Sequence, residues 1–200
     1  VQRLIAGFPD VRARILIGEE KITANPKLNN LQKGWVATQA QWIAMADSNL
    51  LLPKSYLREL VAKWHEGTGL VTSPPLGDRA EGLWGAVECA FLNTNQARWQ
   101  LAADALGVGF AQGKTMFWQR ETLEAVGGLK ALGRKLAEDV TATKVVREAG
   151  GKVRLVDAPY AQPIGRRAAR AVWDRQLRWA RVRRDGFKSL FALEIFNGPA

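Results

Sequence analysis

The 200-residue sequence contains one cysteine, Cys89, and one histidine, His65. A single cysteine excludes an internal disulfide, and such scarcity is typical of a reducing compartment. A single histidine argues against a metal site built from several histidines and against a Ser-His-Asp triad. His65 follows an expected helix at residues 53–64, where capping of the helix end is the simpler interpretation.

The sequence also lacks a long apolar run. No stretch of about eighteen apolar residues is present, so no transmembrane helix is predicted within it. Residues 1–5, Val-Gln-Arg-Leu-Ile, contain neither an initiator methionine nor the pattern of a signal peptide. We therefore expect the chain to be a piece of a longer protein.

Acidic residues are outnumbered, and the positive excess is unevenly placed. The formal net charge is +10, and residues 166–188 carry nine basic side chains against two acidic ones, which accounts for +7 of it. Such a segment suits either an anionic membrane surface or a nucleic acid. Charge alone therefore leaves two classes of partner open.

Strand and helix patterns alternate along the chain, which predicts an α/β fold with a largely parallel sheet. Prolines predict loops at residues 73–78 and 157–165. Strands are expected at residues 13–18, 42–46, 70–72, 115–118 and 152–156. Helices are expected from residue 26, over 53–64, 83–106, 120–126 and 138–150, and from residue 167.

Residues 42–49, Trp-Ile-Ala-Met-Ala-Asp-Ser-Asn, form an apolar run that ends on an acid. The unbroken apolar part predicts a strand covered on both faces. In an open α/β sheet, ligands bind outside the carboxyl ends of the strands. Asp47, Ser48 and Asn49 are therefore candidate oxygen ligands for a divalent cation that also touches phosphate. The alternative is an ordinary turn, which all three residue types favour.

Two expected helix N-termini carry charged side chains. Asn25 and Pro26 are typical of a helix start, and Lys27 then lies at a natural anion site. Glu138 and Asp139 open a later helix, where acids are electrostatically favourable. The structural alternative in both cases is an ordinary capped helix.

Two further motifs involve basic residues. Arg175 and Arg178 are three residues apart and share a helix face, with Trp179 beside them. Gly113-Lys114-Thr115 is not a phosphate-binding loop, because the position that such a loop requires to be glycine is Val108.

These separated residues match the needs of sugar transfer from a nucleotide donor. A carboxylate such as Asp47 can hold a metal that offsets the charge of the leaving diphosphate. Arginines such as Arg175 and Arg178 make forked contacts to phosphate oxygens. A second carboxylate, Asp139, can take the proton from an acceptor hydroxyl. An aromatic ring such as Trp179 offers a face to a sugar or an acceptor.

The motifs resemble those of the ceramide glucosyltransferases, which form glycosyltransferase family 21 and are relatives of family 2. The resemblance runs in order over about residues 13–184, and the segment 141–143, Thr-Ala-Thr, suggests a bacterial member. The matching motifs are Asn25-Pro26-Lys27-x-Asn29-Asn30-Leu31, Asp47-Ser48, Ala137-Glu138-Asp139 and Arg175-x-x-Arg178-Trp179.

The resemblance implies a GT-A-type fold, a mostly parallel mixed sheet flanked by helices. It implies inverting transfer of glucose from UDP-glucose to the primary hydroxyl of ceramide by an integral membrane protein, at the cytoplasmic face. Asp139 would be the catalytic base, and Asp47 would hold Mg²⁺ or Mn²⁺. The donor-binding residues would be Lys27, Asn29, Asp47, Ser48, Arg175, Arg178 and Trp179.

The chain departs from the family pattern in two ways. The familiar Asp-x-Asp is here Asp47-Ser48-Asn49, so an amide replaces one acid. The family's first strand, whose acid helps to hold the uridine, and its membrane helices are missing. We expect a core truncated at both ends: a catalytic part over residues 1–165, and a basic amphipathic helix with a membrane-proximal tail over 166–200.

Several alternatives stay open. The acceptor could be another lipid, such as a hopanoid or diacylglycerol, and the donor another UDP-sugar; a processive polysaccharide synthase fits less well. A nucleic-acid-binding module would use the basic helix and the eight tryptophans. Most tryptophans lie in apolar stretches, and Asp47 and Asp139 would face a polyanion. We therefore expect a membrane surface and no nucleic acid as the partner.

Overall fold

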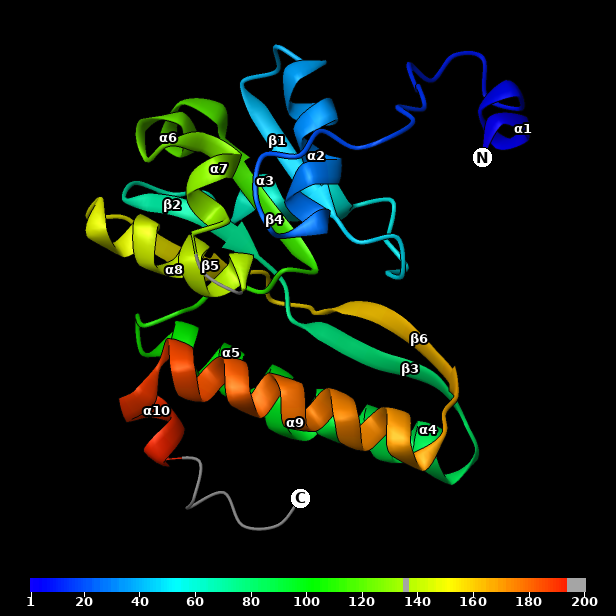
Figure 1. The fold of residues 1–200 in the computed structure, drawn as a ribbon, viewed down its shortest axis with the longest axis vertical. Coiled ribbons are helices and arrows are strands. Elements are labelled where there is room, and N and C mark those ends of the chain that lie inside the picture. Colours follow the sequence, from blue (N-terminus) through cyan, green and yellow to red (C-terminus); the bar gives the residue numbers. More distant parts are fainter. Residues whose placement is uncertain (135–136, 194–200) are drawn as a thin grey trace.

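The computed structural model describes residues 1–134 and 137–193. One part is a four-stranded sheet with helices on both faces, and the other is a layer of helices and a two-stranded ribbon below it (Figure 1). The sheet strands are β1 (Trp42–Ala46), β2 (Thr68–Thr72), β4 (Thr115–Gln119) and β5 (Lys152–Leu155).

The sheet is mixed, with the order β1-β4-β2-β5. Strand β4 runs antiparallel to both β1 and β2, and only β2 and β5 pair in parallel. The prediction of a mixed sheet flanked by helices is confirmed, but the prediction that it is mostly parallel is wrong. Parallel pairing needs a helix that returns the chain across the sheet. The long helical segment before β4 lies instead in the lower layer (Figure 1).

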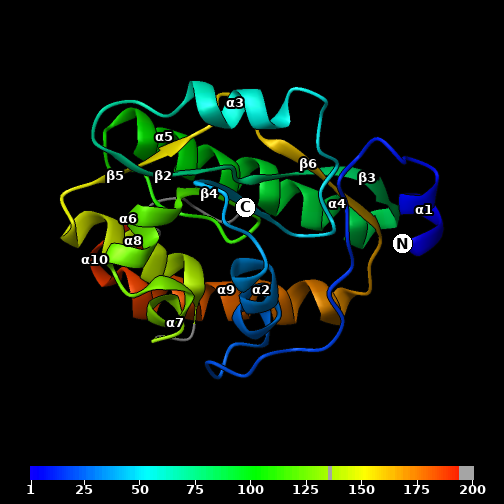
Figure 2. The same cartoon turned by 90° about the horizontal axis from the view of Figure 1, so that it is seen from above.

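Helices cover the two faces of the sheet (Figure 2). On one face α3 packs against Val71 and Phe117. On the other face α2, α7 and α8 pack against Met116 and Trp118. The helices of this part are α2 (Pro26–Val36), α3 (Tyr56–Ala62), α6 (Arg120–Ala125), α7 (Gly128–Leu132) and α8 (Glu138–Glu148).

Strand β1 forms where it is predicted but is not buried on both faces. It is an edge of the sheet, because it pairs only with β4. Met45 is its one buried residue, and Trp42 is 39% exposed while its ring stacks on Phe117 at 5.1 Å. The apolar run lacks alternation because the outward positions Ala44 and Ala46 are small, and their exposure costs little.

The lower layer contains two strands where loops are predicted. Strands β3 (Pro75–Glu81) and β6 (Tyr160–Arg166) form a parallel ribbon. The prolines are compatible with these strands: Pro75 begins β3, and Pro163 lies in a two-stranded ribbon in which every strand is an edge. The loop predictions for residues 73–78 and 157–165 are therefore wrong over most of their length.

Long helices complete this layer. A single helical segment, predicted at residues 83–106, comprises α4 (Gly82–Ala90), the π-helix η1 (Phe91–Ala97) and α5 (Arg98–Ala105). The predicted basic helix is α9 (Ala169–Gly186), which runs beside α4 and α5 and is followed by α10 (Lys188–Leu193) (Figure 1). The predicted tail beyond residue 193 lies outside the described residues, and the division of the chain at residue 165 stays a prediction.

The strand predicted at residues 13–18 does not form. This segment and α1 (Gln2–Ala6) extend away from the sheet (Figure 1), and Ile17 is 85% exposed. Its backbone is held instead by Lys33 of α2, whose Nζ donates to the Leu16 carbonyl at 3.0 Å. A strand needs a neighbouring strand to pair with, and the described residues offer none at this place.

None of the helices within residues 1–134 and 137–193 combines the length and the apolar character needed to cross a bilayer.

Candidate active site

Four segments converge at the carboxyl end of β1: the N-terminus of α2, the turn after β1, the loop before β4 and the N-terminus of α8. Their side chains form a charged cluster, which consists of Lys27, Asp47, Lys114 and Glu138. Each segment begins or ends a regular element, so the backbone directs these side chains toward one place.

Lys27 is the centre of the charged cluster. Its Nζ lies 3.0 Å from Asp47 Oδ1 and 3.0 Å from Glu138 Oε1, and it also donates to the Gly113 carbonyl. Burial alone would lower the pKa of Lys27, but the adjacent carboxylates of Glu138 and Asp47 outweigh it and raise that pKa. Lys27 is therefore a fixed cation, held between two acids.

Lys114 approaches Asp47 from the other side. Its Nζ lies 2.8 Å from Asp47 Oδ2 and 3.1 Å from Asn49 Oδ1. Burial alone would raise the pKa of Asp47, but the bonds and charges of Lys114 and Lys27 hold it below its ordinary value. Both carboxylate oxygens of Asp47 are thus engaged by ammonium groups.

Asn25 ties the two helix N-termini together. Its Oδ1 accepts from the Lys27 backbone N–H at 2.9 Å, so it caps α2 as predicted. Its Nδ2 donates to Glu138 Oε2 at 3.0 Å. This one side chain therefore fixes the position of α2 relative to α8.

Asp139 follows the charged cluster in the first turn of α8. Its Oδ1 accepts from the Val140 N–H at 2.8 Å, and its Oδ2 accepts from the Gly113 N–H at 3.3 Å. Burial and the neighbouring Glu138 charge nevertheless raise the pKa of Asp139 above its ordinary value. A carboxylate with a raised pKa is a stronger base, and its working range moves toward neutral pH.

Gly113 lies where the two acids of α8 and Lys27 approach the loop. A Cβ at this position would lie 2.8 Å from Glu138 Oε1 and 3.3 Å from Lys27 Nζ. It would also come within 3.6 Å of Asp139 Oδ2. A side chain would therefore displace the charged groups, and only glycine permits this close approach.

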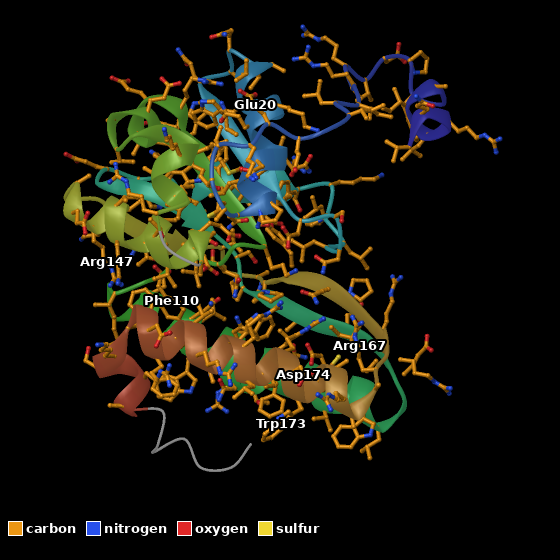
Figure 3. The ribbon with its side chains drawn as sticks, in the orientation of Figure 1. Glu20, Phe110, Arg147, Arg167, Trp173 and Asp174 are labelled. Atoms are coloured by element: carbon orange, nitrogen blue, oxygen red, sulfur yellow. The ribbon has the colours of Figure 1, made fainter. Side chains whose placement is uncertain are left out.

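A cavity of about 170 Å³ opens beside Asp139, between α5 and α9. We call it the α5–α9 cavity. Figure 3 shows Phe110 between α8 and the C-terminal part of α9, at this place. Its wall is mainly apolar and includes Trp99, Ala103, Phe110, Val140, Trp179, Val182, Phe187 and Phe191. Asp139 therefore has the charged cluster on one side and an apolar space on the other.

The structure brings several predicted site residues together. Lys27 and Asp47 are in direct contact, and Asp139 joins them through Gly113. Trp179 of α9 lines the α5–α9 cavity together with Asp139. Ser48 is exposed in the turn after β1, so the turn interpretation of this stretch is confirmed, and its role in donor binding stays a prediction.

Asn29 lies elsewhere. It is 4% exposed, and its Oδ1 accepts from the backbone N–H groups of Ile22 at 3.0 Å and Thr23 at 2.9 Å. These bonds hold the chain that enters α2, which explains an asparagine at position 29 of the helix. Its predicted contact with the donor stays a prediction.

The two arginines of the basic helix do not join the charged cluster in the described part of the chain. Arg175 Nη1 lies 2.8 Å from Glu88 Oε1 on α4, and Glu88 is only 1% exposed. The Arg175 guanidinium also lies 5.8 Å from the centre of the Trp179 ring. Arg178 is exposed on the helix surface. In this conformation Arg175 anchors α9 to α4.

The sequence assigned no role in the site to Lys114, Glu138 or Gly113, and of the cavity wall it indicated only Asp139 and Trp179. The signal for Lys114 was present, because Gly113-Lys114 is a polar insert directly before a strand. Its meaning depends on the antiparallel register, in which Ala46 pairs with Thr115. That register places Lys114 opposite Asp47.

A divalent cation at the charged cluster would need several oxygen ligands. Within the described ranges no group of three or more His, Cys, Asp or Glu side chains could hold a metal ion. Asp47 and Asn49 offer oxygen ligands of the right type, but Lys27 and Lys114 engage them. With both lysines in place, this arrangement does not fit a bound divalent cation.

Comparison with known proteins gives consistent matches. The family model described as "Glycosyl transferase family 21" matches residues 1–200. "Ceramide glucosyltransferase 1" of Caenorhabditis elegans is 27% identical over 185 residues, which cover 92% of this chain and 40% of that protein. "Ceramide glucosyltransferase 3" of the same organism is 26% identical with the same coverage. The chain thus spans about two fifths of the length of these curated relatives.

Proposed function

Because the chain belongs to glycosyltransferase family 21, we propose that it moves glucose from UDP-glucose to the primary hydroxyl of ceramide, with inversion. A glycosyltransferase needs a site for a polar sugar donor and a site for an acceptor. The observation that carries the proposal is the position of Asp139, between the charged cluster and the apolar α5–α9 cavity. A lipid alcohol is the acceptor that such a boundary suits.

The chemical step uses Asp139 as the general base. The acceptor hydroxyl, presented from the cavity, gives its proton to the Asp139 carboxylate while its oxygen attacks the anomeric carbon of the sugar. The bond to the diphosphate breaks, and its electron pair leaves with UDP. A single displacement from the opposite face inverts the anomeric centre. The raised pKa of Asp139 supports this role, because it makes the carboxylate a better proton acceptor.

The charged cluster supports the donor side of the proposal. Lys27 and Lys114 are cations held in place by Asp47, and ammonium groups offset the charge of a diphosphate. Ser48 lies in the adjoining turn. The donor-binding roles of Arg175, Arg178 and Asn29 follow from the family motifs and stay predictions.

A divalent cation at Asp47 also stays a prediction. Mg²⁺ or Mn²⁺ would have to replace one of the two lysine contacts of the Asp47 carboxylate. Electron paramagnetic resonance of the protein titrated with MnCl₂, with and without UDP, tests this directly. Bound Mn²⁺ that disappears in Asp47→Ala would support the prediction, and unbound Mn²⁺ in both proteins would contradict it.

We also propose that the catalytic part works at a membrane surface. Residues 166–188, which include helix α9, carry +7 of the net charge of +10, and Trp173 on the outer side of α9 is 69% exposed (Figure 3). Leu83 and Trp84 on α4 are exposed as well. Tryptophan favours the lipid–water interface, and each nearby Lys or Arg adds about 1 kcal/mol of attraction to anionic lipids.

A lipid-product assay of the full-length protein tests the proposed function. Ceramide, diacylglycerol and a hopanoid are offered with labelled UDP-glucose, UDP-galactose and UDP-N-acetylglucosamine in turn. We expect a β-linked glucosylceramide, because the two relatives named above are called ceramide glucosyltransferases. If the product is a glycosylated hopanoid or diacylglycerol, that lipid and not ceramide is the acceptor. The absence of any glycolipid product would contradict the proposal.

A further inference from the structure

The helical segment beside the α5–α9 cavity contains a π-helix, η1. Within it, the Asn93 side chain bonds both backbone groups of Gly77: Oδ1 accepts from the N–H at 2.6 Å, and Nδ2 donates to the carbonyl at 3.0 Å. These bonds attach η1 to β3. The next turn then places Asn95 and Gln96 on the cavity wall.

Two glutamines on this wall have unused hydrogen-bonding capacity. Gln96 and Gln100 are four residues apart, so they lie on one face of the helical segment, and both line the cavity. Gln100 is 2% exposed. The Oε1 atom of each is buried and has no hydrogen-bond partner within the described residues. Buried polar atoms in folded proteins are nearly always paired, so these two carbonyls need hydrogen-bond donors from a ligand or from water in the cavity.

The surroundings define the chemistry of that ligand. The rest of the wall is mainly apolar, with large rings such as Trp99 and Trp179. Its other polar members are Asn95, Gln112, Arg183 and Asp139. Two amide carbonyls accept hydrogen bonds, so they need donors on the ligand in addition to the hydroxyl at Asp139. A lipid whose only donor is the reacting hydroxyl would leave the carbonyls unpaired.

We propose that Gln96 and Gln100 select the acceptor, by accepting hydrogen bonds from an amide N–H or a second hydroxyl next to the reacting hydroxyl. The inference rests on the proposed function, since it places the reacting hydroxyl at Asp139. It goes further by assigning recognition of the acceptor's polar head to two residues of η1 and α5. These residues discriminate between lipid alcohols and leave the sugar donor unaffected.

The experiment compares two lipids with the same reacting group in the full-length protein. A short-chain ceramide carries a primary hydroxyl, a secondary hydroxyl and an amide N–H, whereas dioctanoylglycerol carries the primary hydroxyl alone. We expect Gln100→Leu and Gln96→Leu each to lower kcat/KM for the ceramide by roughly 10-fold. In both variants, kcat/KM for dioctanoylglycerol and KM for UDP-glucose should stay within about twofold of the wild-type values.

Gln176→Leu is the matched control. Gln176 on α9 also has a buried amide atom without a partner in the described part of the chain, but it is not among the residues that line the cavity. Gln176→Leu should leave kcat/KM unchanged for both the ceramide and dioctanoylglycerol. An equal loss with both lipids in the Gln96 and Gln100 variants would indicate a structural role and overturn the proposal, as would no loss with either.

A binding measurement separates this inference from the proposed function. Trp99 and Trp179 line the cavity, so a bound lipid with a brominated chain should quench their fluorescence. In Asp139→Asn, which cannot transfer, the brominated ceramide should still bind more tightly than the brominated diacylglycerol, and Gln100→Leu should abolish that preference. If the protein binds the brominated ceramide more tightly but the wild type transfers no sugar to any lipid, only the proposed function is contradicted. Equal affinities in the protein with both glutamines would overturn the inference.

Discussion

The Lys27 ammonium lies 3.0 Å from the Asp47 carboxylate and thereby joins the N-terminus of α2 to the carboxyl end of β1. The same ammonium lies 3.0 Å from Glu138, so one cation holds three elements at the candidate active site. Removing it would leave two carboxylates close together without their shared counter-ion. The first prediction concerns this group.

Lys27→Met should lower the free energy of unfolding by about 1–2 kcal/mol, because the pair is partly buried and one lysine, Lys114, still contacts Asp47. It should also weaken binding of UDP by roughly 10-fold, measured by calorimetry. Lys33→Met is the control, since Lys33 donates to the Leu16 backbone carbonyl and is not a member of the charged cluster. Unchanged UDP affinity in Lys27→Met would remove this lysine from the donor site.

Asp139→Asn should lower turnover by roughly 10² to 10⁴ while UDP-glucose binding is retained. Asp157→Asn, an exposed acid paired with Lys63, is the control and should be fully active. Lipid-product formation and donor calorimetry give the two quantities. More than a tenth of wild-type turnover in Asp139→Asn would contradict its role as the base.

The raised pKa of Asp139 also predicts how stability depends on pH. A carboxyl whose pKa is higher in the folded than in the unfolded state binds more protons when folded, so its contribution to stability is present below the unfolded pKa. That contribution is lost as pH rises through the folded pKa, which lies above the ordinary 3.8. Asp139→Asn should therefore be more stable than wild type at pH 7. Denaturant unfolding of both proteins at pH 4 and pH 7 measures the difference; a less stable variant at pH 7 would contradict the assignment.

Gly113→Ala should disturb the site through steric contact alone. Its Cβ would approach Glu138 Oε1 to 2.8 Å, so the contact between Glu138 and Lys27 must shift, at a cost of about 1–3 kcal/mol. Alanine keeps the backbone N–H, but turnover should fall because the shift of the loop lengthens the 3.3 Å bond from that N–H to Asp139 Oδ2. Gly34→Ala is the matched control: it lies within α2, its Cβ would meet nothing within 4 Å, and it should stabilise by about 0.5–1 kcal/mol. Equal stability and activity in both variants would mean that the loop adapts freely.

Arg175→Lys and Arg178→Lys test two different roles: Arg175 holds α9 on α4, and Arg178 is predicted to bind the donor diphosphate. Arg175 pairs with the buried Glu88, so Arg175→Lys should lower the free energy of unfolding by about 1–3 kcal/mol. Arg178 is exposed, so Arg178→Lys should leave stability within about 0.5 kcal/mol and reduce kcat/KM for UDP-glucose. Thermal unfolding and donor kinetics check both. An Arg178→Lys variant as active as wild type would refute the predicted diphosphate contact.

The sequence by itself determined the local elements that carry the site. The Asn25-Pro26 start of α2, the strand at residues 42–46 and the acids that open α8 all lie where local rules predict them. Capping, periodicity and helix-dipole effects act within a few residues, so they can be predicted from short segments of the sequence. The motif resemblance, and with it the family, also depends only on residue order.

Only the tertiary structure decided which side chains meet. The antiparallel entry of β4 beside β1 brings Lys114 to Asp47, and the packing of α9 on α4 takes Arg175 to Glu88. The packing of η1, α5 and α8 places Gln96, Gln100 and Asp139 around one cavity. Strand order and helix packing depend on which distant surfaces bury each other. A short window of sequence does not indicate which distant element a strand or helix will pack against.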